Sequence, residues 1–148
     1  MIKERILFVE DEPDIQELVR HNLSNEGYSV DCTGSGENAL SKLKEYKPDL
    51  VLLDLMLPGM DGINVCKNIK SNSRTHDMPI IMLTAKREEN DILEGFKAGA
   101  DDYMTKPFSV RELSCRIKSV LSKNKKAGSN RGGFFNYPYN MYRFSPII

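Results

Sequence analysis

A short apolar run that ends in a single acid constrains the fold of this chain more than any other stretch. Residues 50–53 are all leucine or valine, Asp54 follows them, and the turn residues at 47–49 precede them. Such a run between turn signals is typical of a strand buried on both faces of a parallel sheet. Open α/β sheets bind ligands at the carboxyl ends of their strands, so we take Asp54 as the candidate reactive centre.

Asp54 has a second interpretation, because aspartate is also a good helix N-cap and a helix does follow it. The intervening stretch contains Pro58, Gly59 and Gly62, and the next helical pattern starts only near Asp61. This spacing argues against a cap at Asp54.

Apolar runs of strand type alternate five times with amphipathic patterns of helical period. The predicted strands are 5–9, 28–32, 50–54, 78–84 and 102–106, and the predicted helices are 13–25, 36–46, 61–71, 88–98 and 110–123. In the first helix, Ile15, Leu18, Val19 and Leu23 are expected on one face. Because such crossovers are right-handed, the order predicts an α/β fold with a parallel five-stranded sheet covered by helices on both faces.

Charged and hydroxyl side chains end four of the five predicted strands, and in a parallel sheet these ends share one edge. The residues are Glu10, Asp11, Asp54, Thr84 and Lys106. Packed carboxylates repel one another unless a cation intervenes, and an all-oxygen cluster suits Mg²⁺. We expect the metal ligands to be Asp11, Asp54 and the backbone carbonyl of Met56, with Glu10 acting through water.

Each of these side chains has an ordinary structural interpretation when it is taken alone. Asp11 could cap a helix, Thr84 could be a β-branched strand residue, and Lys106 could be a solvated charge. Their convergence favours phosphoryl transfer, which needs an acceptor and fixed charges around the phosphoryl oxygens. Asp54 is then the acceptor, Lys106 a cation that pairs with it at rest, and Thr84 a hydroxyl donor.

Four stretches of the sequence carry a family resemblance: 6–12, 49–62 around Asp54, 79–85 and 99–108. With them, residues 3–123 resemble a receiver domain of a two-component response regulator. The resemblance implies a flavodoxin-like (βα)5 sandwich with strand order 2-1-3-4-5 and Mg²⁺ as cofactor. It also implies that Asp54 accepts a phosphoryl group from a phosphohistidine of a sensor histidine kinase. The Lys106–Pro107 peptide bond is expected to be cis.

The same resemblance implies how such a domain switches. After phosphorylation, Thr84 would move toward the phosphoryl group and Tyr103 would turn inward, which remodels the surface of the fourth helix, fifth strand and fifth helix. The ordinary interpretation of Tyr103 is a half-buried strand aromatic with its hydroxyl in water.

Residues 99–108 are most similar to receivers of the transcription factors that carry a winged-helix DNA-binding domain. Those receivers dimerise through the fourth helix, the fifth strand and the fifth helix. Asp102, Glu112 and Arg116 are the expected members of this pairing.

The charge distribution divides the chain near Asn124. Residues 1–124 hold all 21 acidic residues and 17 Lys and Arg, whereas residues 125–148 hold four basic residues and six of the twelve aromatic ones. We expect a receiver domain at 1–124 and a basic, aromatic-rich tail at 125–148 whose role is open. The tail is too short for a winged-helix domain, so binding to DNA would require a missing effector domain.

No apolar run approaches the roughly 20 residues of a membrane span, and the first residues show no signal-peptide pattern. The three cysteines, at 32, 66 and 115, have no metal-binding spacing. These features predict a cytoplasmic protein with reduced thiols and no membrane partner.

Three classes of function compete for this sequence. An aspartyl-phosphate phosphatase would need a second acid where Met56 stands, and a flavin carrier would need a loop rich in Ser, Thr and Gly where residues 10–13 are mostly acidic. The expectation is therefore a signalling switch, a regulator that undergoes self-phosphorylation and slow autodephosphorylation rather than a turnover enzyme. Within this class, the receiver part of a transcriptional regulator competes with a stand-alone receiver that acts only by protein contacts.

Overall fold

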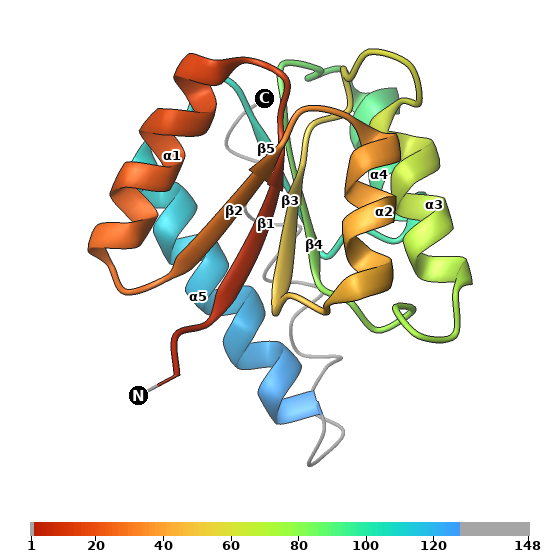
Figure 1. The fold of residues 1–148 in the computed structure, drawn as a ribbon. Coiled ribbons are helices and arrows are strands. Elements are labelled where there is room, and N and C mark those ends of the chain that lie inside the picture. Colours follow the sequence, from red (N-terminus) through yellow and green to blue (C-terminus); the bar gives the residue numbers. More distant parts are fainter. Residues whose placement is uncertain (1, 128–148) are drawn as a thin grey trace.

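The computed structural model describes residues 2–127, so the tail predicted for 125–148 lies outside the described residues except for its first three. Strands and helices alternate along the described chain (Figure 1). The elements are β1 (Arg5–Val9), α1 (Pro13–Asn25), β2 (Ser29–Thr33), α2 (Gly36–Glu45), β3 (Leu50–Leu53), α3 (Gly62–Ser71), β4 (Ile80–Thr84), α4 (Glu89–Ala98), β5 (Asp102–Thr105) and α5 (Val110–Ala127).

The five strands form one parallel sheet in the order β2-β1-β3-β4-β5. Helices α1 and α5 cover one face, and α2, α3 and α4 cover the other, as Figure 1 shows. The predicted fold class and strand order are therefore confirmed. The order changes direction beside β1 and β3, and this is where an open sheet of this kind forms its ligand crevice.

The two helical layers bury two separate apolar cores because successive strand residues point to opposite faces. Leu7 and Val9 belong to the core under α2, α3 and α4, whereas Ile6 and Phe8 belong to the core under α1 and α5. All four residues of β3 are fully buried, as the doubly buried strand predicted from residues 50–53 requires. The central strands thus hold the residues that follow them at a fixed edge.

Helix α3 begins at Gly62 and is capped by Asp61, whose side chain accepts a hydrogen bond from the backbone N–H of Asn64 at 2.9 Å. This is the cap that the alternative interpretation had assigned to Asp54. Asp54 therefore serves no capping role and is left at the strand end.

The first helix differs from its prediction at one position. Leu18 is 48% exposed, whereas Val19 and Leu23 are fully buried. Leu18 lies about 100° around the helix from Val19, so it falls outside the stripe that Val19 and Leu23 define four residues apart. The expectation that Leu18 shares the buried face was wrong.

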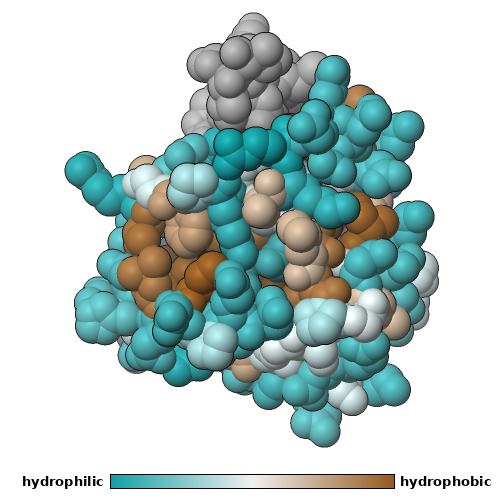
Figure 2. All heavy atoms as spheres, turned by 90° about the horizontal axis from the view of Figure 1, so that it is seen from above, coloured by the Kyte–Doolittle hydropathy of each residue, from teal (hydrophilic) through white to brown (hydrophobic). Residues whose placement is uncertain are grey.

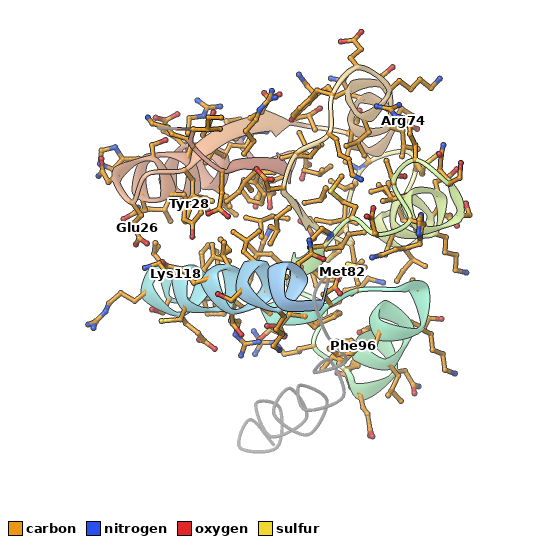
Figure 3. The ribbon with its side chains drawn as sticks, turned by 90° about the horizontal axis from the view of Figure 1, so that it is seen from below. Glu26, Tyr28, Arg74, Met82, Phe96 and Lys118 are labelled. Carbon is orange, nitrogen blue, oxygen red and sulfur yellow. The ribbon has the colours of Figure 1, made fainter. Side chains whose placement is uncertain are left out.

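Helix α5 runs to Ala127, past the end expected near residue 123. It buries Leu113, Ile117, Val120 and Leu121 against the sheet. Its Lys118 lies 3.6 Å from Glu26 after α1, and both are labelled in Figure 3. None of the described helices is both long and apolar enough to cross a membrane.

The burial of the three cysteines gives a direct test of the fold. Cys115 is exposed and Cys32 half-buried, whereas Cys66 is buried, and burial raises the pKa of its thiol to about 11. Because the thiolate is the reactive form, we expect Cys115 to react first with a thiol reagent such as DTNB, and Cys66 only on unfolding. Cys115→Ser should remove the fast phase, and rapid labelling of Cys66 in the native protein would contradict this packing.

Candidate functional site

The carboxyl ends of the strands gather the predicted site residues at one edge of the sheet. Figure 2 looks down on this edge, where hydrophilic residues cover most of the surface and hydrophobic areas lie among them. Glu10, Asp11 and Asp54 each offer a carboxylate oxygen here, and these three oxygens lie within 4.8 Å of one another. Among the described residues, this is the group of acids dense enough to hold a metal ion.

Two of the three acids are removed from water. Glu10 is fully buried and Asp54 is 3% exposed, whereas Asp11 is exposed. Burial raises the pKa of Glu10, and the nearby charge of Asp54 adds to this shift. Bringing buried carboxylates together is unfavourable unless positive charge compensates them.

Lys106 supplies positive charge from the end of β5. Its Nζ lies 2.7 Å from Oε1 of Glu10 and 3.1 Å from Oδ2 of Asp54. Burial alone would lower the pKa of Lys106, but the hydrogen bond to Glu10 and the charge of Asp54 outweigh it and raise the pKa. The ammonium therefore stays charged. The pairing with Asp54 was expected, whereas the shorter contact with Glu10 was not.

The loop after β3 folds back on the end of its own strand. The backbone N–H of Met56 donates to Oδ1 of Asp54 at 3.0 Å, and that of Gly62 donates to the carbonyl of Leu55 at 3.1 Å. A Cβ at Gly62 would lie 2.3 Å from the carbonyl oxygen of Asp54, so no other residue fits there without a shift. The carboxylate of Asp54 is thus fixed by Met56 on one oxygen and by Lys106 on the other.

Thr84 and Tyr103 meet at the loop after β4. Thr84 is fully buried, and its Oγ1 accepts a hydrogen bond from the N–H of Lys86 at 3.3 Å. The hydroxyl of Tyr103 donates to the carbonyl of Lys86 at 2.7 Å. The Tyr103 ring is fully buried, so the half-buried side chain of the ordinary interpretation is not what this structure contains.

Helix α4 makes room for the Tyr103 ring. A Cβ at Gly95 would lie 2.9 Å from two atoms of the ring. Phe96, labelled in Figure 3, has its ring centroid 6.4 Å from that of Tyr103. Burial is the largest contribution that raises the pKa of the Tyr103 hydroxyl.

The three residues expected on the dimer surface form a network within one chain. Arg116 is 3% exposed and lies 3.1 Å from Asp102 and 2.7 Å from Glu112. It also donates to the carbonyl of Tyr103 at 3.0 Å. This network lies at β5 and α5, apart from the acidic cluster. Beside the cluster, the Lys106–Pro107 peptide bond is cis.

Sequence reasoning missed two charged side chains that hold the loops around the site. Arg87 donates to the backbone carbonyl of Lys106, and Glu37 accepts from the backbone N–H of Met60 at 3.2 Å. Both side chains belong to exposed residues, and each contacts a backbone group that is distant from it in the sequence. No motif or spacing in the sequence could have pointed to them.

Comparison with known proteins decides the family. Residues 6–118 match the response regulator receiver domain. The chain belongs to the response regulator receiver domain family. Membership makes this receiver a phosphorylation-controlled component of two-component signalling.

The receiver is similar to several individual proteins. It is 48% identical over 126 residues to the alkaline phosphatase synthesis transcriptional regulatory protein PhoP of Bacillus subtilis, a match that covers 85% of this chain and 52% of PhoP. The chain therefore spans about half the length of this curated relative.

Two solved structures share the fold and part of the sequence. The first is the BeF3-activated N-terminal receiver domain of RstA from Klebsiella pneumoniae, with a TM-score of 0.74, 32% identity, and coverage of 80% of this chain and 98% of that one. The second is a two-component response regulator from Clostridium difficile, with a TM-score of 0.77, 29% identity, and coverage of 81% and 97%.

Measurements of protein stability can test whether Lys106 offsets the negative charge of the acidic cluster. Lys106→Ala leaves two buried carboxylates without their ammonium, so in the absence of divalent ions it should lower the free energy of unfolding by about 3 kcal/mol. Because a bound cation would replace the lost charge, added Mg²⁺ should stabilise this variant more than the wild type. Urea unfolding with and without Mg²⁺ measures both, with Lys47→Ala as the control at an exposed ion pair. An equal response of Lys106→Ala and wild type to Mg²⁺ would contradict the account.

The contact between Gly95 and Tyr103 predicts whether a substitution at Gly95 stabilises or destabilises the protein. Replacing a mid-helix glycine by alanine stabilises a helix by up to about 1 kcal/mol when nothing obstructs the methyl group. Here the methyl group meets the Tyr103 ring, so Gly95→Ala should destabilise the protein by roughly 1 kcal/mol. In a Tyr103→Ala background the same substitution should become stabilising. Denaturant unfolding of the wild type, the two single variants and the double variant measures this as a double-mutant cycle. Stabilisation by Gly95→Ala in both backgrounds would contradict the contact.

Proposed function

We propose that Asp54 accepts a phosphoryl group from a phosphohistidine of a sensor histidine kinase, with Mg²⁺ bound in the acidic cluster. The observation that carries this proposal is the cluster itself. Asp54 lies at a strand end, buried between Lys106 and two further acids, with one oxygen of each acid within 4.8 Å of the others. Such an arrangement is costly for folding and useful for binding a cation and a phosphate together.

The donor set suits Mg²⁺, a hard ion that prefers oxygen ligands and keeps several waters. We assign Asp11, Asp54 and the Met56 carbonyl as direct ligands. Glu10 is fully buried and bound to Lys106, which supports an indirect role through water. When bound, the ion supplies positive charge that offsets the negative charge of the phosphoryl oxygens.

Transfer to Asp54 requires little chemistry beyond positioning. One carboxylate oxygen of Asp54 forms a bond to phosphorus while the P–N bond of the donor breaks, and the imidazole nitrogen leaves with the bonding electron pair. Lys106 exchanges its contact with Asp54 for one with a phosphoryl oxygen, and Thr84 donates its hydroxyl to another. The same acyl phosphate is expected to hydrolyse slowly, so the protein acts as a regulator rather than as a turnover enzyme.

The switch is a shift between two arrangements of Thr84 and Tyr103. Both side chains bond to Lys86, so movement of Thr84 toward the phosphoryl group is linked through one loop to the packing of Tyr103. The inward ring agrees with the arrangement assigned to the phosphorylated state. Phosphorylation would then stabilise the arrangement in which Thr84 has moved toward the phosphoryl group and Tyr103 lies inward.

The output that fits this receiver best is transcriptional control, supported by the similarity to PhoP over the receiver region. The receiver domain would occupy residues 1–124 in the cytoplasm. A homodimer through α4, β5 and α5 would draw on Asp102, Glu112 and Arg116, and would have to exchange contacts that Arg116 makes within its own chain. DNA binding would require an effector domain, and a stand-alone receiver that acts through protein contacts is the second candidate.

Intact mass spectrometry after incubation with acetyl phosphate tests the acceptor. The wild type should gain the mass of one phosphoryl group, and only with Mg²⁺, whereas Asp54→Asn should gain none because it lacks the attacking carboxylate oxygen. Asp49→Asn, at the opposite end of the same strand, is the matched control and should behave as the wild type. A full adduct on Asp54→Asn would rule out Asp54 as the acceptor.

Sizing of the same samples tests the output. A dimer that forms only on phosphorylation supports the dimerising regulator. An adduct without a change of size supports the stand-alone alternative, in which a different protein reads the switch.

A further inference from the structure

The start of helix α2 is packed against the loop that carries Met56. A Cβ at Gly36, the first residue of α2, would lie 2.4 Å from Cγ2 of Val65 in α3 and 3.2 Å from the carbonyl oxygen of Met60. Figure 1 shows α2 and α3 side by side on the same face of the sheet. At Gly36 the backbone of α2 therefore lies directly against the Val65 side chain of α3 and against the backbone of the loop.

Glu37, the next residue, holds the tip of this loop. Its Oε2 accepts the backbone N–H of Met60 at 3.2 Å. A Cβ at Gly59 would lie 2.9 Å from the same oxygen, and Gly59 has a φ of +74°, in the left-handed region that favours glycine. The carboxylate of Glu37 thus sits directly on the turn at residues 59–60.

The loop is held at its base, next to β3, and at its tip by different contacts. The strand end is held by the bond from Met56 N–H to Asp54 and by the bond from Gly62 N–H to Leu55. The tip is held by Glu37 from α2. The segment before α2 also lies close to the other acidic loop, because a Cβ at Gly34 would be 3.9 Å from Cα of Asp11.

We infer that Glu37 is a positioning residue for the Mg²⁺ site, through the hydrogen bond that holds the loop of residues 55–62. The inference rests on the proposed function, since it assigns Met56 as a ligand. A loop held at its base and at its tip presents the Met56 carbonyl in one place before the ion arrives. A loop released at its tip populates other conformations, and the apparent dissociation constant for Mg²⁺ rises by the inverse of the competent fraction.

Two substitutions separate this hydrogen bond from a simple effect of charge. Glu37→Ala removes both the acceptor and the charge, whereas Glu37→Gln removes the charge and keeps an acceptor oxygen for Met60. Glu45→Ala removes an exposed acid from the other end of the same helix and is the matched control.

The experiment is titration calorimetry of Mg²⁺ binding to the unphosphorylated proteins, with urea unfolding to establish that each variant folds. Glu37→Ala should weaken Mg²⁺ binding about fivefold, as expected for the loss of one modest hydrogen bond. Glu37→Gln and Glu45→Ala should bind within about twofold of the wild type on the same reasoning. Phosphorylation of Glu37→Ala by acetyl phosphate should need more Mg²⁺ but reach the wild-type rate at saturation.

Several outcomes would overturn the inference. Unchanged Mg²⁺ binding by Glu37→Ala would show that the loop needs no such contact. Equal weakening by Glu37→Gln and Glu37→Ala would assign the effect to charge, and a lower rate at saturating Mg²⁺ with unchanged affinity would assign it to the acceptor. If the wild type itself binds no Mg²⁺, the proposed metal site fails, which is a result distinct from a normal wild type with an unaffected Glu37→Ala.

Discussion

The ammonium of Lys106 between two buried carboxylates is the interaction on which the site depends. Glu10 and Asp54 lie at the ends of adjacent strands, and the sheet brings them together regardless of their charge. Lys106 reaches them from the far side of β4 and contacts both, at 2.7 and 3.1 Å. Its positive charge offsets the electrostatic cost of placing two buried carboxylates close together, which would otherwise be strongly unfavourable.

This compensation is partial, which is what gives the site its chemistry. Three acids and one lysine leave excess negative charge at a single edge of the sheet, and a divalent cation would offset it. A phosphoryl group on Asp54, as proposed, would add negative charge again, which the lysine and the divalent cation together would offset. In the proposed function, the same electrostatic imbalance would link metal binding, phosphoryl acceptance and movement of the loops that hold Thr84 and Tyr103.

Much of this architecture could be predicted from the sequence because it depends on local patterns. The doubly buried run at 50–53 and the alternation of strands with helices predict the sheet, and the sheet then places Asp54 beside Glu10. The features that could not be predicted depend on how far a long side chain extends across the sheet and on the angular position of a residue around its helix. The contact of Lys106 with Glu10 crosses two intervening strands, and Leu18 lies outside the buried stripe although it is apolar. Glu37 holds Met60 through a backbone group, which no residue pattern records.

The most direct test of the account identifies the residue that carries the phosphoryl group. Borohydride reduces the acyl phosphate of an aspartate to homoserine, so peptide mapping after treatment with acetyl phosphate reads the acceptor position. The account predicts conversion at Asp54, dependent on Mg²⁺, with Glu10 and Asp11 unchanged. Conversion at another residue, or at Asp54 to the same extent without Mg²⁺, would contradict it.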